Sequence, residues 1–475
     1  MAAAWPEENA PDARKSLDKD AQIVHNKVEA LPFFRKGPDA GDPEGGESHG
    51  SKGAVPIMRW NFCGDTGALR AGIEELAQEL GIEAVFGEEG FTVRVAHGEA
   101  DRLSAVRSGN ELTITCGRRI HFFRALGLAV ERMRKNDRDF RIEETVYFTT
   151  NGPMFDVSQG NAVLNTGTVR FLLRRMALMG LDMLMLYCED SYVVPGEPYF
   201  GYMRAKYTEE ELRALDDYAD LFGIEMVPCI QTLAHLTEVL KWSHVYGGIR
   251  DDEACLLVGE EETYAFLRRL LETMKRCFRS RRIHVGMDEA AGLGLGQHLR
   301  LHGPVDRTEL MRRHLARVME LVRELGLEPM MWSDMLFSGA GFGFYDPEFT
   351  CTQETIDAVP EGMGLVFWEY CKTDPDFYER YLDIHQTLGR TIFAGGIHTW
   401  TGFGCNWAYT FGASYPALMA CKRKGCREVF ATVWGDAGTE CNMLATLPGL
   451  QFFAEHGYRA DPTLEEIAAR FELCT

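Results

Sequence analysis

Short apolar runs alternate with amphipathic helical patterns along the chain from Met154 onward. The runs are rich in β-branched, aromatic and sulfur-containing residues and are short enough to be buried strands. Segments between them, such as 168–180 and 308–326, repeat apolar residues every three or four positions, which indicates helices. The predicted strands are 154–158, 183–190, 225–231, 283–289, 328–334, 364–370, 391–398 and 428–436.

Continuous apolar strands separated by amphipathic helices are typical of a parallel sheet covered by helices. Eight such units within roughly 300 residues favour a closed (β/α)8 TIM barrel over an open doubly wound sheet. No Gly-rich GxGxxG turn follows the first of these strands, which disfavours a dinucleotide-binding fold. We therefore predict a barrel over residues 151–460.

The chain outside the barrel divides into three predicted parts. Residues 54–150 combine helical patterns at 66–81 and 120–135 with β-type runs at 91–97 and 112–117, which indicates a small α+β domain. Residues 1–53 are polar and end in a stretch rich in Gly, Pro and acidic residues, typical of a flexible N-terminal extension and linker. Residues 461–475 read as the start of a C-terminal helical segment.

Charge and cysteine usage narrow the class of protein. A formal net charge of -21 argues against nucleic acid or an anionic membrane as partner. We see no signal peptide and no apolar stretch of membrane-spanning length. The 13 cysteines include no CxxC pair, so we expect buried reduced thiols and a cytoplasmic location.

Acids and large aromatic residues end most of the predicted barrel strands. Carboxyl ends of parallel strands meet at one rim, where TIM barrels carry their active sites. Aromatic faces stack on sugar rings, and carboxylates bind hydroxyls and transfer protons in glycoside hydrolysis. The rim residues are Glu189, Asp190, Asp288, Glu289, Trp332, Asp334, Trp368, Tyr370, His398, Trp400, Trp434 and Asp436.

The stretch RRIHVGMDEA places Asp288 directly before Glu289. Adjacent carboxylates repel each other, and packing alone gives no reason for the pair. One acid can protonate a leaving oxygen while the other holds a part of the substrate that itself acts as nucleophile. The nearby His284 suggests a metal ligand, but its apolar neighbours favour a buried, hydrogen-bonded imidazole.

The stretch HVGMDEA resembles the H-x-G-x-D-E motif of glycoside hydrolase family 20, the β-N-acetylhexosaminidases. Further segments resemble a bacterial branch of that family in the same order, and the resemblance covers about residues 55–460. They are PYFGYMRAKYTEEEL, PCIQTLAHL, PMMWSDM, VFWEY, FAGGIHTWTGF and TVWGDAGTE.

The resemblance implies substrate-assisted catalysis, in which the substrate's 2-acetamido group attacks C1. Glu289 would be the general acid and then the base, Asp288 would accept from the acetamido N–H, and Tyr370 would donate to its carbonyl oxygen. Each tryptophan could instead be rim packing, and His235 a structural histidine. The implied substrate-binding residues are Gln159, Asn161, Glu189, His235, Trp332, Asp334, Trp368, Trp400, Trp434 and Asp436.

Three positions depart from the family pattern. No arginine follows the first barrel strand, where Gln159 and Asn161 stand instead. His398 stands where a tryptophan is expected, and Cys371 where a second tyrosine is expected. These changes spare the acidic pair but leave the choice between GlcNAc and GalNAc open.

The sequence favours an exo-acting retaining β-N-acetylhexosaminidase without metal or cofactor. Its partner would be a small glycan or glycoconjugate with terminal β-linked N-acetylhexosamine. A non-catalytic carbohydrate-binding protein on a hydrolase-like barrel is the alternative, and a metal-dependent hydrolase using His284 and His235 is a third. The oligomeric state, including a homodimer, stays open.

Overall fold

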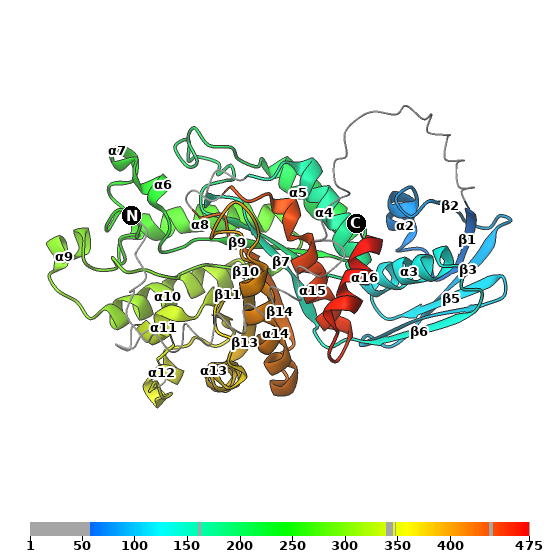
Figure 1. Cartoon of the computed structure of the whole chain (residues 1–475). Coiled ribbons are helices and arrows are strands. Elements are labelled where there is room, and N and C mark those ends of the chain that lie inside the picture. Colours follow the sequence, from blue (N-terminus) through cyan, green and yellow to red (C-terminus); the bar gives the residue numbers. More distant parts are fainter. Residues whose placement is uncertain (1–57, 160–162, 339–344, 347, 437–439, 475) are drawn as a thin grey trace, which may run out of the picture.

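The computed structural model describes residues 58–159, 163–338, 345–346, 348–436 and 440–474. The predicted extension 1–53 and the site candidate Asn161 lie outside these residues. A six-stranded sheet precedes a closed eight-stranded barrel, so the predicted fold class is confirmed (Figure 1). None of the helices in the described ranges is long and apolar enough to cross a membrane.

The small sheet has the strand order β2-β1-β3-β5-β4-β6, and β4 runs in the opposite direction to the other five strands. Sequence patterns indicated β3, β5 and both helices, but missed the other strands. The elements are β1 (Met58–Gly64), α2 (Arg70–Ala77), β2 (Ile82–Val85), β3 (Phe91–His97), β4 (Arg102–Ser108), β5 (Glu111–Cys116), α3 (Arg119–Arg134) and β6 (Phe140–Thr145).

The barrel closes through parallel pairing of β14 with β7, and a ring of helices surrounds it (Figure 1). Each strand overlaps one of the predicted apolar runs, although β7 begins four residues before its predicted start. The first half consists of β7 (Thr150–Asp156), α4 (Thr166–Met179), β8 (Met183–Cys188), α5 (Glu209–Asp220), β9 (Glu225–Ile230), α6 (Thr237–Leu240), α7 (Ser243–Tyr246), α8 (Glu261–Cys277), β10 (Arg282–His284), α9 (Gln297–His302) and α10 (Arg307–Glu324).

The second half of the barrel continues the same alternation, and the last two helices follow its final strand. Figure 1 shows the short helices α6, α7, α9 and α11 on one side of the barrel, which is the side of the strands' carboxyl ends. The elements are β11 (Glu328–Trp332), α11 (Asp334–Ser338), α12 (Gln353–Asp357), β12 (Gly364–Trp368), α13 (Pro375–Leu388), β13 (Arg390–Gly396), α14 (Trp407–Lys424), β14 (Glu428–Val433), η3 (Met443–Thr446), α15 (Leu447–Tyr458) and α16 (Leu464–Cys474).

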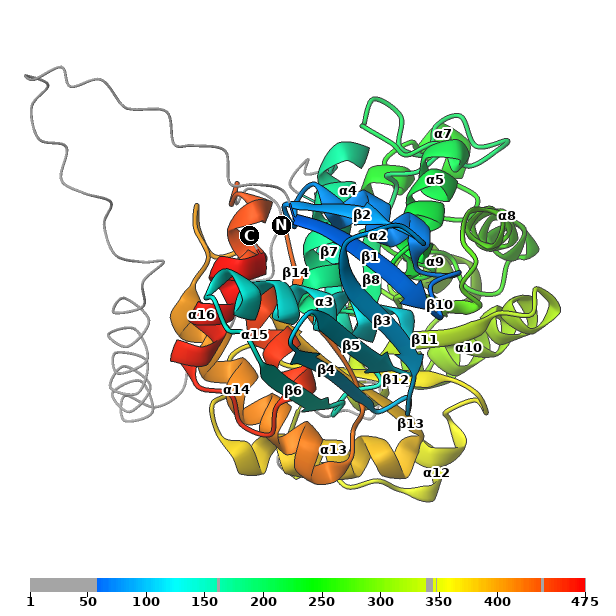
Figure 2. The same cartoon turned by 90° about the vertical axis from the view of Figure 1, so that its right-hand side faces the viewer.

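A buried ion cluster joins the small sheet to the barrel. Arg124 of α3 is 1% exposed, and its Nε donates to Glu144 Oε2 of β6 at 2.6 Å. Its Nη1 donates to Glu455 Oε1 of α15 at 3.0 Å and to the Met179 carbonyl of α4 at 2.7 Å. Because breaking a buried pair leaves an uncompensated charge, this cluster fixes α3 against the barrel (Figure 2).

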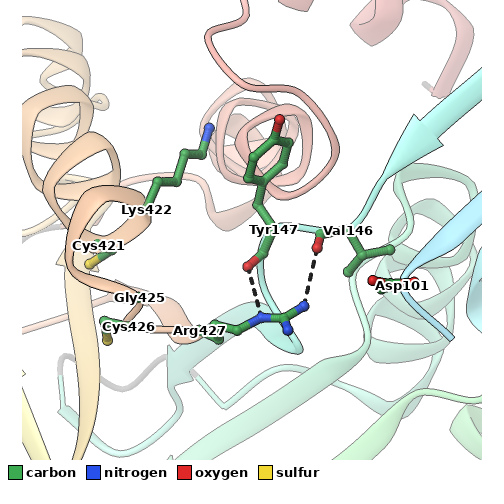
Figure 3. Close-up of a pocket in the computed structure, with 8 residues that line it drawn as sticks. All are labelled: Asp101, Val146, Tyr147, Cys421, Lys422, Gly425, Cys426 and Arg427. Atoms are coloured by element: carbon green, nitrogen blue, oxygen red, sulfur yellow. Dashed lines mark hydrogen bonds between the residues drawn. The ribbon is translucent and has the colours of Figure 1, made fainter.

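A cavity of about 250 Å³ lies at the amino end of β14, opposite the rim. Arg427 donates from Nε to the Tyr147 carbonyl at 3.3 Å and from Nη2 to the Val146 carbonyl at 3.2 Å (Figure 3). The Lys422 ammonium donates to the Arg459 carbonyl at 2.7 Å. Both cations are therefore engaged by backbone carbonyls, which makes this cavity part of the joint between the sheet and the barrel.

Candidate active site

The acidic pair lies in a loop beyond its strand, because β10 ends at His284. The predicted strand 283–289 is therefore too long. Gly286, Met287 and Glu289 have φ values of +71°, +75° and +48°, a left-handed backbone that cannot continue a strand. A Cβ at Gly286 would meet Gln231 Oε1 at 2.0 Å, so only glycine fits beside this amide.

Asp288 is held in its ionised form by two neighbours. Gln231 Nε2 donates to its Oδ1 at 2.7 Å, and His235 Nε2 lies 3.2 Å from its Oδ2. Burial alone would raise the pKa of Asp288, but the charge of His235 and the hydrogen bond from Gln231 outweigh burial and lower it. Burial likewise acts to lower the pKa of His235, and Asp288 raises it to about 10.

Glu289 has the opposite environment, although it is the next residue. Its side chain is 48% exposed, and its backbone N–H donates to Asp334 Oδ2 at 2.9 Å. Partial burial, then the negative charge of Asp288, raises the pKa of the Glu289 carboxyl. Two neighbouring acids with pKa values moved apart match the division between a proton donor and a charge stabiliser.

Asp334 supports this arrangement from the start of α11. It is fully buried, and Trp368 Nε1 donates to its Oδ1 at 3.3 Å. Burial, then the charge of Asp288, raises the pKa of Asp334 to about 7. Its Oδ2 fixes the backbone of Glu289, so the structure brings Asp334, Trp368 and the acidic pair together.

Aromatic residues at the ends of four strands meet beside the acids. The Tyr370 ring stacks on Trp368 with centroids 5.4 Å apart, and Trp400 meets it edge-on at 5.2 Å. The Trp434 indole N–H donates to the Tyr370 hydroxyl oxygen at 3.1 Å, which leaves the hydroxyl hydrogen available for another acceptor. Trp332 is 1% exposed and lies against Trp434, with centroids 5.8 Å apart, in the barrel interior.

A second polar group lies at the ends of β7 and β8. Gln159 Nε2 and the Tyr187 hydroxyl both donate to Glu189 Oε1, at 2.7 Å and 3.1 Å. Burial, then the charge of Asp156, raises the pKa of Glu189 to about 8. The same two causes raise the pKa of Asp436 to about 6. A neutral carboxyl, such as that of Glu189 at pH 7, can both donate to and accept from sugar hydroxyls.

These raised pKa values predict that the protein loses stability as pH rises. The pKa of Glu189 is about 8 in the fold against an ordinary value of 4.5, so its contribution is complete below about pH 4.5 and is lost as pH rises through 8. Glu189→Gln should reduce the dependence of the unfolding free energy on pH by up to about 1 kcal/mol per pH unit. Urea unfolding between about pH 5 and pH 8 measures this dependence. Equal slopes in variant and wild type would contradict the assignment.

Sequence reasoning missed three residues that the site uses. Gln231 bonds Asp288, and Tyr187 accepts from Gln231 Nε2 at 2.9 Å while it donates to Glu189. Arg204 bonds the Ser158 carbonyl and lies 3.2 Å from Asp190 Oδ1, so a cation reaches the end of β7 from the loop after β8. A polar residue ending an apolar strand was the available signal for Gln231.

His284, the last residue of β10, is buried, as expected, and its Nδ1 accepts the Gly286 N–H at 3.1 Å. Burial lowers its pKa to about 3, so it is a neutral imidazole. Within the described residues, no group of three or more His, Cys, Asp or Glu side chains is arranged to hold a metal ion. Each cysteine whose side chain the structure describes is a free thiol.

Comparison with known proteins points to one family. The model of the glycosyl hydrolase family 20 catalytic domain matches residues 196–369. This part of the barrel runs from the loop after β8 to the end of β12. Hexosaminidase D from Bos taurus is 28% identical over 203 residues, and that from Homo sapiens is 27% identical. Those matches cover 40% of this chain, and 55% and 39% of the two relatives, so the chain matches about half of their length or less.

Solved structures share the fold at lower identity. A β-N-acetylhexosaminidase from Bacteroides fragilis has a TM-score of 0.63 at 15% identity, covering 86% of this chain and 88% of that one. The family 20 enzyme from Streptomyces coelicolor has a TM-score of 0.65 at 18% identity, covering 88% and 92%. Residues 196–369 therefore match the catalytic domain of glycosyl hydrolase family 20, and the chain shares its fold with solved β-N-acetylhexosaminidases.

Proposed function

We propose that this protein is an exo-acting retaining β-N-acetylhexosaminidase that removes terminal β-linked GlcNAc or GalNAc by substrate-assisted catalysis. The observation that carries the proposal is the pair Asp288–Glu289, whose pKa values shift in opposite directions on one loop. The relatives named hexosaminidases, and a Vibrio harveyi structure of the same fold that holds N-acetylglucosamine, support the substrate class. The substrate would be a glycan or glycoconjugate with such a terminal sugar.

In the first proposed step, the acetamido carbonyl oxygen attacks C1 and the bond from C1 to the leaving oxygen breaks. Glu289 gives its proton to that oxygen, which its raised pKa favours. Asp288 accepts the acetamido N–H and offsets the positive charge that develops on the oxazolinium ion. Tyr370, whose hydroxyl oxygen already accepts from Trp434, donates its hydrogen to the attacking carbonyl oxygen.

In the second proposed step, Glu289 is ionised and takes a proton from water. The water oxygen attacks C1 and opens the oxazolinium ring, which returns the acetamido group and restores the protonated acid. Two inversions at C1 give net retention. Trp368, Trp400 and Trp434 would enclose the sugar ring, and Glu189 and Asp436 would bind its hydroxyls.

Matched aryl glycosides test the proposal, because the nucleophile belongs to the substrate. We expect turnover of aryl β-GlcNAc or β-GalNAc, and at least about 10³-fold less turnover of the β-glucoside, which lacks the acetamido group. N-acetylglucosamine-thiazoline, which resembles the oxazolinium ion, should inhibit competitively. The GlcNAc to GalNAc ratio would show which epimer the group around Glu189 prefers.

Cleavage of the β-glucoside at a comparable rate would exclude substrate assistance. Binding of these sugars without any turnover would instead support the carbohydrate-binding alternative. Loss of activity in excess chelator would support the metal-dependent alternative.

Free thiols among the described cysteines support the proposed cytoplasmic location.

A further inference from the structure

His398 connects two of the residues that form the proposed pocket. Its Nε2 lies 2.6 Å from the Tyr370 carbonyl oxygen, which only accepts, so the imidazole carries its proton on Nε2 and donates it. Its ring stacks on Trp400 with centroids 4.2 Å apart and planes 24° apart. A second stacked contact, at 5.2 Å, joins it to Tyr409 of α14.

The backbone of His398 is fixed as well. Its N–H donates to Thr410 Oγ1 at 3.0 Å, and its carbonyl accepts the Asn406 N–H at 2.8 Å. The residue is 2% exposed, so its ring has little freedom to turn. The imidazole therefore holds one position between the loop after β12 and the start of α14.

The imidazole is neutral in this position. Burial lowers the pKa of His398 to about 4. Its Nδ1 is buried and has no hydrogen-bond partner among the residues that the structure describes, so no carboxylate there favours the charged form. A neutral ring that donates from Nε2 can hold a carbonyl without adding charge to a site that already contains His235.

Close packing around Gly396 makes this connection stiff. A Cβ at Gly396, near the end of β13, would lie 2.8 Å from the Trp400 ring and 2.9 Å from the Tyr370 ring. The two rings thus fill the space over the glycine. His398 fixes the backbone of Tyr370 by its hydrogen bond and the ring of Trp400 by stacking. Its contacts reach the Tyr370 main chain rather than the space where a sugar would lie.

We propose that His398 is a positioning residue that sets the hydroxyl of Tyr370 and the ring of Trp400 for catalysis. The proposal rests on the function proposed above, because Tyr370 is the assigned donor to the acetamido carbonyl oxygen. It predicts that loss of the Nε2 donor misplaces that hydroxyl, so turnover suffers more than binding. A displacement of about 1 Å at a reacting group can cost about 100-fold in rate.

Two variants distinguish the role of the His398 Nε2–H donor from that of the His398 ring. His398→Phe keeps an aromatic ring against Trp400 but removes the N–H, and we expect kcat to fall about 10- to 100-fold with KM changed less than about threefold. His398→Gln can place an amide N–H near the position of Nε2 and should recover most of kcat. If His398→Phe keeps wild-type kcat, or if His398→Gln is equally impaired, the proposal is overturned.

A double-variant cycle tests the route through Tyr370. If His398 acts through that residue, adding His398→Phe to Tyr370→Phe should lower kcat by less than about threefold more. If the two single-variant losses of kcat multiply in the double variant, His398 does not act through Tyr370. His121→Phe is the matched control: His121 is a buried histidine of α3, remote from the rim, and its replacement should leave kcat unchanged.

A spectroscopic measurement keeps this proposal distinct from the function. If the wild-type protein cleaves none of the glycosides, the proposed function fails, but near-ultraviolet circular dichroism still reports Trp400. His398→Leu should then remove the ellipticity that Trp400→Phe also removes, because Trp400 loses its stacking partner. An unchanged His398→Leu spectrum would overturn the proposed positioning of Trp400.

Discussion

Replacing Glu289 by glutamine is expected to lower kcat for 4-methylumbelliferyl β-GlcNAc by about 10³-fold, while the protein keeps its fold. The amide cannot give a proton to the leaving oxygen, and positioned general acids contribute about 10²- to 10⁴-fold. The side chain is 48% exposed, and its neighbour His235, 3.7 Å away, keeps the closer carboxylate of Asp288 at 3.2 Å, so stability should change little. Steady-state kinetics and thermal melting measure the two effects.

Leaving-group chemistry makes the test specific to proton donation. A 2,4-dinitrophenyl leaving group needs little protonation, so the first step should be nearly as fast in Glu289→Gln as in wild type. The second step still lacks a base, and azide, which needs none, should restore turnover and yield the β-glycosyl azide. Glu253→Gln, at an exposed glutamate between β9 and α8, is the control and should be fully active. Equal losses of kcat/KM, which reports the first step, for both leaving groups, or the absence of the azide product, would remove Glu289 from its assigned role.

Most of the fold could be predicted because buried parallel strands have a simple signature. Most barrel strands are runs of apolar residues, and the helices between them have one apolar face. The small sheet was harder, since strands such as Met58–Gly64 and Arg102–Ser108 alternate buried and exposed residues over only seven positions. Such short patterns resemble those of loops.

The acidic loop shows why residue identity could be predicted but geometry could not. The pair Asp288–Glu289 is plain in the sequence, yet β10 stops four residues before Asp288. A left-handed backbone at Met287 and Glu289 has no sequence signature, because such residues rarely adopt it. Only Gly286 hinted that the strand would break.

The electrostatics of the site depend on residues far apart in the chain. The opposite pKa shifts of Asp288 and Glu289 arise because Gln231, at the end of β9, bonds only Asp288 of the two, and His235 lies closer to Asp288, at 3.2 Å, than to Glu289, at 3.7 Å. Sequence adjacency predicts mutual repulsion but not which acid keeps the proton. Arg204 is a similar case, since tertiary structure alone brings it to the end of β7.

Replacing Asp288 by asparagine is expected to lower kcat by about 10³-fold with aryl β-GlcNAc. Removing a preorganised group that stabilises transition-state charge typically costs this much. A neutral amide cannot offset the positive charge on the oxazolinium ion. Its NH₂ group is also a donor, so it cannot accept the acetamido N–H as a carboxylate oxygen does. The preference for the acetamido sugar over the β-glucoside should shrink as well. Kinetics on both substrates measure the loss.

The same variant has a second consequence at His235. Asp288 is the main reason that the pKa of His235 is raised to about 10, so asparagine should lower that pKa toward or below its ordinary value of 6.5. NMR titration of the His235 ring protons would follow it. The wild-type ring should stay charged throughout the neutral range, whereas the variant ring should lose its proton there.

Asp182→Asn is the matched control for a buried aspartate. Asp182 is 7% exposed, and Arg118 bonds it at 2.6 Å just before β8 begins, at the end of the barrel opposite the rim. Its replacement should lower stability without changing kcat or the His235 titration. If Asp288→Asn keeps kcat within tenfold of wild type and also keeps the β-glucoside discrimination, Asp288 does not stabilise the oxazolinium ion. If kcat falls while His235 still titrates near pH 10, another group charges that histidine, and the pairing between Asp288 and His235 is wrong.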